Sequence, residues 1–134
     1  MTIPSTSMSP KDIILAACRL FEAMRGDEAV DRYFSPDYIE HNPTIVGGGI
    51  EGFRQLLRDE GFTTGVNRRG LSFHIHHVVA EGELVFVHQH VTEPGKPPLI
   101  IMDLYRVHDG RIVEHWDVMQ TVPDSAANDR HAMV

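Results

Sequence analysis

Two aspartates and a histidine occur together in an apolar stretch near the carboxyl end of the chain. Asp103, His115 and Asp117 lie within residues 99–119, where most other side chains are apolar. A charged group inside an apolar pair of strands is costly unless it is paired with another group or used in chemistry. The pattern therefore indicates one wall of a small-molecule pocket.

Proton transfer is the chemistry that such groups could perform. In an apolar cavity, one carboxylate can take a proton from carbon while a neutral acid or an imidazole donates to the developing enolate oxygen. Burial raises the pKa of a carboxyl group and lowers that of a histidine. We predict that Asp103 or Asp117 is the general acid–base, with His88 and His41 as its partners.

Structural roles remain open for the same side chains. Asp103 could form an ion pair with Arg106 or Arg111. His88 could be a hydrogen-bonded histidine of the core, and His41 could cap a local turn.

Four strands are expected after Gly70, where the hydrophobic period changes from about 3.6 residues to about 2. Their connections are short, and short connections join antiparallel neighbours. The expected strands span residues 71–80, 83–92, 99–108 and 111–119.

The register of the last two strands depends on the turn between them. A three-residue loop at 108–110 would place Asp103 opposite His115, whereas a two-residue turn at 109–110 would place Asp103 beside Trp116. We favour the longer loop because it gathers the polar groups on one face.

The register of the preceding pair depends on the proline-rich connection at 93–98. A loop of that length pairs Thr92 with Leu99. His88 would then lie opposite Asp103 and join the same cluster.

Helices are expected before the strands. Ser9 can act as an N-cap and Pro10 suits the first helical position, so the first helix begins there and ends at Gly26. Helices followed by strands predict an α+β fold, in which a curved antiparallel sheet carries the helices on one face and leaves a cone-shaped cavity. The remaining segments expected are a helix from Asp27 to the Ser35-Pro36 stop, an extended piece at 37–43 and a helix at 50–60.

Composition excludes several classes of protein. The 134 residues suit one compact domain, expected at 9–120 between a flexible segment 1–8 and a tail 121–134. A net charge of −7 argues against nucleic-acid binding, and no apolar run approaches the roughly 20 residues that span a membrane. The single cysteine, Cys18, and a first segment unlike a signal peptide favour a cytoplasmic protein.

The nine histidines raise the question of a metal ion. His74 and His76, followed by Glu81, partly match the first metal-binding motif of cupins. The glycine spacing of that motif is absent, and so is the second motif. We therefore predict neither a metal site nor a cofactor.

The chain resembles a known family in its order of elements and in two phrases, YIEHNP and MDLYRVHDGRIVEHWDV. Over about residues 10–120 it is similar to SnoaL-like proteins, which belong to the superfamily named after nuclear transport factor two. Relatives include polyketide cyclases, ketosteroid isomerases and limonene epoxide hydrolases. The resemblance implies cofactor-free acid–base chemistry in an apolar cone and a homodimer.

Two departures from these relatives narrow the expected activity. Position 101 is isoleucine where limonene epoxide hydrolases have an arginine, and the first helix lacks the tyrosine of ketosteroid isomerases. We predict a cyclase, isomerase, aldol-type or hydrolase enzyme acting on a small apolar carbonyl compound; the alternative is a non-catalytic ligand-binding module. The side chains expected to contact the substrate are Tyr38, Asn42, Ile101, Tyr105, His115 and Trp116. The alternative role is core packing for the two tyrosines, and packing in the core or at a dimer interface for the tryptophan.

Overall fold

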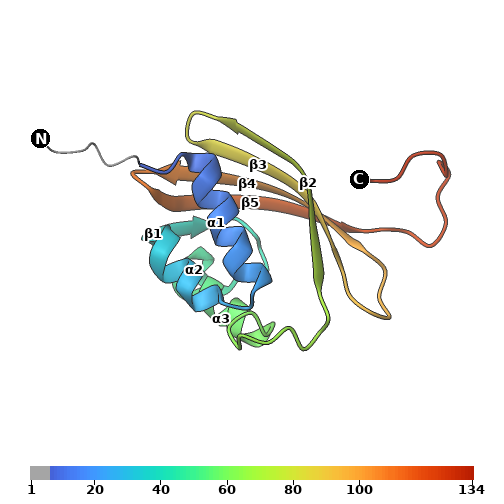
Figure 1. Ribbon diagram of the computed structural model, residues 1–134, viewed down its shortest axis with the longest axis horizontal. Helices are drawn as coiled ribbons and strands as arrows, with labels where there is room; N and C mark the ends of the chain where they lie inside the picture. The colour runs from blue at the N-terminus through green and yellow to red at the C-terminus, as the bar shows by residue number, and fades with distance from the viewer. Residues whose placement is uncertain (1–6) are drawn as a thin grey trace, which may run out of the picture.

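The computed structural model describes residues 7–134, so most of the segment expected to be flexible lies outside the described residues. Three helices and five strands form two layers (Figure 1). The elements are α1 (Pro10–Glu22), α2 (Gly26–Tyr33), β1 (Phe34–Glu40), the 3-10 turn η1 (Val46–Gly48), α3 (Ile50–Asp59), β2 (Ser72–Glu81), β3 (Leu84–Thr92), β4 (Leu99–His108) and β5 (Arg111–Thr121).

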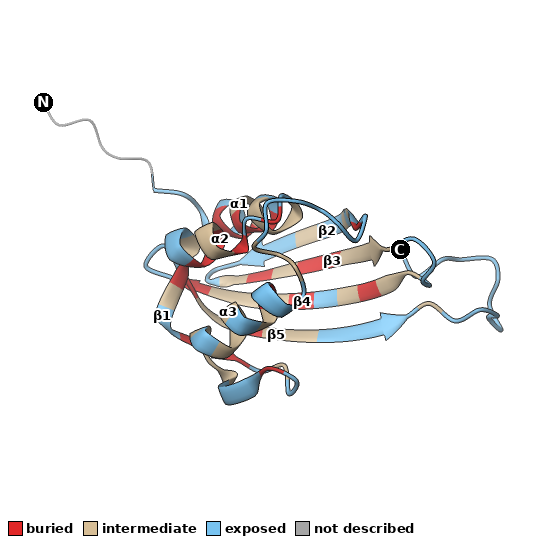
Figure 2. Cartoon of the chain, turned by 90° about the horizontal axis from the view of Figure 1, so that it is seen from below, coloured by how far each residue is buried: buried red, intermediate tan, exposed pale blue. Residues whose placement is uncertain are grey.

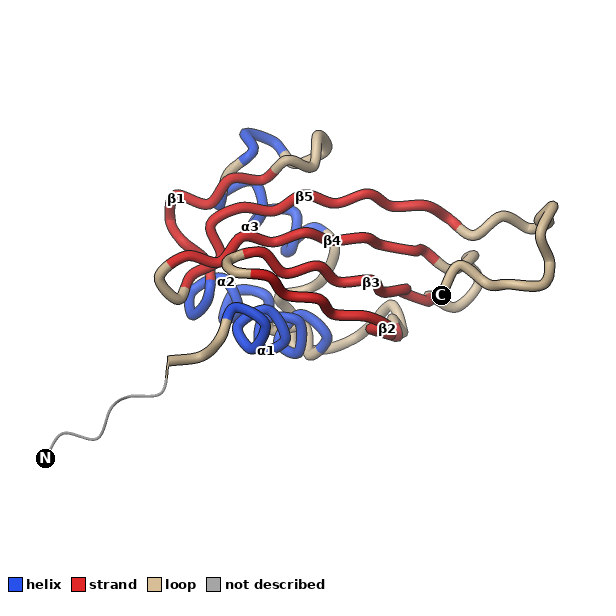
Figure 3. Tube along the Cα trace, turned by 90° about the horizontal axis from the view of Figure 1, so that it is seen from above, coloured by secondary structure: helices blue, strands red, loops and turns tan. Residues whose placement is uncertain are grey.

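The sheet has the strand order β1-β5-β4-β3-β2 (Figure 3). Strands β2 to β5 form the expected antiparallel meander. Strand β1 joins its open edge by pairing in parallel with β5, so the complete sheet is mixed. The fold is therefore α+β, as predicted, with an additional parallel strand that brings residues of the extended segment beside β5.

Helix α1 begins as the sequence predicts. The Ser9 hydroxyl accepts a hydrogen bond from the Asp12 backbone N–H at 3.1 Å, which satisfies one free donor of the first turn. The helix ends at Glu22 rather than at Gly26, because Met24 turns the chain with a φ of 58°. Gly26 instead starts α2.

The hydrophobic core lies between the helices and one face of the sheet, which we call the inner face (Figure 2). The helices lie over this face because each presents one apolar side. None of the three described helices lies on the opposite, outer face (Figure 2). The largest fully buried side chains are Ile14, Val30, Val85, Val87 and Ile112.

A two-residue turn joins β4 to β5. Asp109 and Gly110 both have positive φ, at 49° and 75°, as a type I′ turn requires. His108 pairs with Arg111, so the expected three-residue loop is wrong.

A β-bulge then corrects the alternation of side chains in β5. The pairing with β4 skips Val113, which lies between Ile112 and Glu114. Neighbouring strand residues face opposite sides, so Ile112 and His115 could not both face inward from a regular strand. The extra residue brings both to the inner face and places Asp117 directly opposite Asp103. Neither register considered from the sequence predicts that pair.

The register between β3 and β4 also differs from the prediction. Val87, not His88, lies opposite Asp103, and His88 pairs with Met102. A shift of one residue moves every side chain to the other face of a sheet. His88 therefore lies on the outer face, and the prediction that it joins the acidic cluster is wrong.

The tail after Thr121 contains no helix or strand, yet it lies against the sheet. The backbone N–H of Val122 donates to the carbonyl oxygen of Pro98 at 2.9 Å. Near the end of the chain, the carbonyl oxygen of Met133 lies 3.0 Å from Nε2 of His88. Among residues 7–134, no helix is both long and apolar enough to cross a membrane.

Candidate functional site

A cavity of about 350 Å³ lies between the helices and the inner face of the sheet. Its walls are mostly apolar, and the helices α1 and α3 contribute to them. Of the side chains expected to contact a substrate, five line the cavity: Tyr38, Asn42, Ile101, Tyr105 and His115. Polar groups gather where β1, β4 and β5 adjoin, and these groups could do chemistry there.

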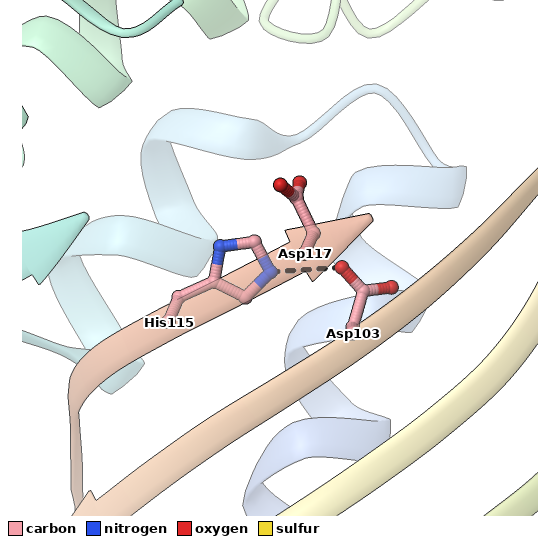
Figure 4. A group of neighbouring side chains, drawn as sticks. All are labelled: Asp103, His115 and Asp117. Atoms are coloured by element: carbon pink, nitrogen blue, oxygen red, sulfur yellow. Dashed lines mark hydrogen bonds and ion pairs between the residues drawn. The ribbon is translucent and has the colours of Figure 1, made fainter. Parts of the chain in front are cut away.

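The imidazole of His115 lies between two buried carboxylates. Nε2 of His115 lies 2.8 Å from Oδ1 of Asp103 (Figure 4). Nδ1 of His115 lies 3.0 and 2.9 Å from the two carboxylate oxygens of Glu40. Both ring nitrogens face acceptors, so the ring that fits is the doubly protonated imidazolium.

Glu40 reaches His115 because β1 pairs in parallel with β5, which sets the two residues opposite each other. Its carboxylate also accepts hydrogen bonds from the Tyr38 hydroxyl and, at 2.9 Å, from the Asn42 backbone N–H. Glu40 is not among the site residues predicted from the sequence. A signal was present, because Tyr38 and Glu40 are two residues apart and therefore share a face of an extended segment.

The charges of this group reinforce one another. Burial alone would lower the pKa of His115, but its hydrogen bonds and ion pairs with Asp103 and Glu40 outweigh burial and raise that pKa to about 9. Burial works against the Glu40 carboxylate too, yet its bonds with His115 and Tyr38 hold the Glu40 pKa below the usual range. We call Glu40, His115 and Asp103 the ion triad.

Asp117 lies beside the ion triad but is not part of it. Figure 4 shows its carboxylate directed away from the bond between His115 and Asp103. Among the described residues its hydrogen-bond partner is the Asn42 side-chain amide, with Nδ2 3.3 Å from Oδ2. Burial raises the pKa of Asp117 and outweighs the nearby His115 imidazolium and the Asn42 amide, which lower it; the carboxylates of Asp103 and Glu40 add to the rise. Asp117 is therefore a candidate for proton exchange in the cavity.

Gln89 is a second residue that sequence reasoning missed. Its side-chain amide donates to Oδ2 of Asp103 at 2.8 Å and lines the cavity. The register shift that turns His88 outward turns Gln89 inward, so the sequence offered no signal without the correct register.

Two other predicted site residues lie outside the cavity. Nε2 of His41 lies 2.7 Å from the Glu114 carboxylate, and its ring stacks on Trp116 at 4.7 Å between centroids. The guanidinium of Arg106 also lies over the Trp116 ring, 5.9 Å from its centroid. His41 and Trp116 do not line the cavity, so their expected places in the site are wrong.

The cluster offers a poor metal site despite its residue types. One ligand atom each from Asp103, His115 and Asp117 lie within 4.8 Å of one another. A histidine must be neutral at the nitrogen that binds a metal, and His115 carries protons committed to two carboxylates. Cys18 also lines the cavity, where burial raises the pKa of its thiol to about 12 and makes it a poor nucleophile.

Comparison with known proteins matches this arrangement to one family. The SnoaL-like domain family matches residues 15–115, which include every residue of the ion triad. The chain belongs to the SnoaL-like family. This membership accounts for the helices, the sheet and the cavity that they enclose.

Solved structures show the same fold at low sequence identity. IdmH of Streptomyces antibioticus, assigned as a polyketide cyclase, is 22% identical, with a TM-score of 0.62 over 84% of this chain and 92% of its own. A protein of Acidithiobacillus ferrooxidans with the same assignment is 20% identical, with a TM-score of 0.64 over 89% and 91%.

An NTF2-like protein of unknown function from Cytophaga hutchinsonii is 17% identical, with a TM-score of 0.64 over 87% of this chain and 94% of its own. Comparison with curated proteins gives no match. The likeness to these structures establishes the NTF2-like fold of this SnoaL-like chain.

Proposed function

We propose that this SnoaL-like protein is a cofactor-free acid–base enzyme that acts on a small, uncharged carbonyl compound, with Asp117 as the group that moves the proton. One observation carries the proposal: Asp117 has a raised pKa and no ionic partner among the described residues, while the neighbouring Asp103 and Glu40 are both bound to His115. The substrate class follows from the cavity, which is apolar and small.

In the proposed reaction, ionised Asp117 takes a proton from the carbon next to the carbonyl group. The developing enolate oxygen accepts hydrogen bonds from the side-chain amides of Asn42 and Gln89, which both line the cavity. Protonated Asp117 then returns the proton to a different atom of the substrate. The ion triad holds two carboxylates ionised and fixed, so that they position the site without competing for the proton.

A test of Asp117 needs no knowledge of the natural substrate. 5-Nitrobenzisoxazole opens when a base removes its single reactive C–H proton, and a carboxylate in an apolar cavity accelerates that step. We expect turnover by the protein to rise with pH as Asp117 ionises. Asp117→Asn should abolish it, because the amide has the same shape and cannot accept the proton.

A matched variant separates this role from simple damage to the fold. Glu114→Gln removes a carboxylate from β5 that faces the outer surface, and it should retain the full rate. Equal rates for Asp117→Asn and the unaltered protein would overturn the proposal. Binding of the probe in the cavity without any acceleration would favour the ligand-binding module instead.

We also propose that two copies associate through the outer face of the sheet. Val118 and Met102 project from neighbouring strands there with exposures of 73% and 37%. Four residues farther along the same strands, Arg106 and Glu114 form an ion pair within the chain. An apolar patch without net charge fits a second identical patch better than a charged partner.

The single buried cysteine is consistent with a cytoplasmic location, which we infer for the protein.

A further inference from the structure

Five of the nine histidines gather on the outer face of β2 and β3, apart from the cavity. We call them the histidine ladder. The β3 members, His88 and His90, face the same side because they are two residues apart. The β2 members lie across from them, with His74 opposite His90 and His77 opposite His88, and His76 between.

A β-bulge at His76 builds the ladder. The pairing with β3 skips His76, between Ile75 and His77. As in β5, the extra residue lets two apolar side chains three residues apart, Ile75 and Val78, both pack on the core. The same bulge leaves the imidazoles of β2 on the outer face.

The imidazoles contact one another through their ring nitrogens. Nε2 of His76 lies 2.6 Å from Nδ1 of His90, and their ring planes differ by 14°. Nδ1 of His77 lies 3.0 Å from Nδ1 of His88, with planes 13° apart. In each pair one nitrogen donates a hydrogen bond and the other accepts it. The accepting nitrogen therefore carries no proton, and its lone pair points toward its neighbour.

Imidazole is a common ligand of divalent transition-metal ions. A neutral imidazole nitrogen binds Zn²⁺, Ni²⁺ or Cu²⁺ through its lone pair.

We propose that the histidine ladder binds a divalent transition-metal ion, with His76 and His90 as its first two ligands. At metal–nitrogen distances of about 2.0–2.1 Å, two ligands of one ion lie roughly 3 Å apart. The observed pairs are close to that spacing, and His76 is exposed. The ring of His74 stacks on that of His90, with the centroids 4.4 Å apart.

The ladder is a better site than the acidic cluster in the cavity. There the one histidine, His115, is bound through both nitrogens to carboxylates. In the ladder, the hydrogen bonds of the imidazoles run to other imidazoles and, from His88, to the Met133 carbonyl oxygen. A metal ion that binds the ladder therefore breaks only hydrogen bonds between imidazoles. An ion that binds His115 would have to break its ion pairs with carboxylates.

Calorimetric titration with NiCl₂ or ZnCl₂, on a chain without an affinity tag, tests the proposal. We expect saturable binding by the unaltered protein and its loss in the double variant His76→Asn/His90→Asn. His108→Asn removes an exposed histidine that is paired with Glu83 on a distant turn, and it should bind as the unaltered protein does.

The position of the ion is read independently by NMR. Paramagnetic Ni²⁺ or Cu²⁺ should broaden the imidazole signals of His76 and His90 before those of His41 and His115. The proposal is overturned if the unaltered protein does not bind, if the double variant binds equally well, or if His115 broadens first. The last result would place the ion in the cavity.

Discussion

At the scale of single residues, His115 determines the state of the whole site. Its imidazolium lies between the carboxylates of Glu40 and Asp103, and all three side chains are buried. Each carboxylate is stable in the apolar interior because the imidazolium compensates it. The catalytic proposal for Asp117 depends on this pairing, since it keeps the other two carboxylates out of proton exchange.

Replacing His115 should therefore destabilise the protein strongly. His115→Asn leaves two buried carboxylates without a counter-ion, which costs about 3–5 kcal/mol of unfolding free energy. Urea unfolding measures the loss. His41→Asn is the matched control, because its partly exposed pair with Glu114 contributes at most about 1 kcal/mol. Equal losses in the two variants would contradict the ion triad.

The same triad predicts a pH dependence of stability. The pKa of His115 rises from 6.5 to about 9 on folding, so its contribution is complete below pH 6.5 and disappears as pH rises through about 9. We expect about 3 kcal/mol to be lost over this range, measured by urea unfolding at a series of pH values. The Glu40 pKa is lowered on folding, so its contribution is lost on acidification instead. The alkaline loss should be absent in His115→Asn.

At the scale of elements, β-bulges limited what the sequence could predict. The four strands of the meander were placed within a few residues, because alternation and short turns are local signals. The bulges at His76 and Val113 are not local signals, since the reason for each is packing against helices. A prediction that lacks the bulge at Val113 gives the correct order of strands but the wrong partner for Asp103 in β5.

The site was predicted in part for the same reason. Asp103, His115 and Asp117 were found together because buried charge in an apolar stretch is visible in the sequence. His88 and His41 were placed wrongly and Glu40 and Gln89 were missed, because which face a residue occupies depends on register. The spacing of residues in the sequence also does not predict that β1 pairs in parallel with β5.

Helix α3 makes a close approach that can be tested. A Cβ atom added at Gly52 would lie 1.9 Å from the carbonyl oxygen of Val46, so α3 must shift to accept any side chain. Gly52→Ala should cost about 1–3 kcal/mol, measured by urea unfolding, although alanine favours helices. Glu51→Ala, at the exposed neighbouring position, should change stability by less than about 0.5 kcal/mol. Comparable effects would contradict the contact.

At the scale of the whole molecule, the sheet divides two tasks between its faces. The inner face supports the core and the cavity, while the outer face carries the histidine ladder and the apolar patch around Val118. Composition and the order of elements were enough to predict this two-layer arrangement. They held no information on which side chains the outer face exposes, because that depends on the register of the strands.

Association through the outer face predicts the effect of one charged substitution. Val118→Glu puts a carboxylate in the centre of the proposed contact, so two copies should repel and the protein should become monomeric. Light scattering during size-exclusion chromatography measures the mass. Val66→Glu adds the same charge at another exposed valine and should leave the dimer intact. A monomeric unaltered protein, or a dimeric Val118→Glu variant, would contradict the proposal.

The ion triad contains two carboxylates and one imidazolium, so the floor of the cavity carries an excess negative charge. At the rim, the guanidinium of Arg69 is already bound by Glu60 and Glu93, and it cannot compensate a guest. We therefore expect fatty acids, phosphate esters and other anionic metabolites to bind in the cavity more weakly than neutral molecules of similar size. On the proposed function, the ion triad that stabilises the fold would also select guests by their charge.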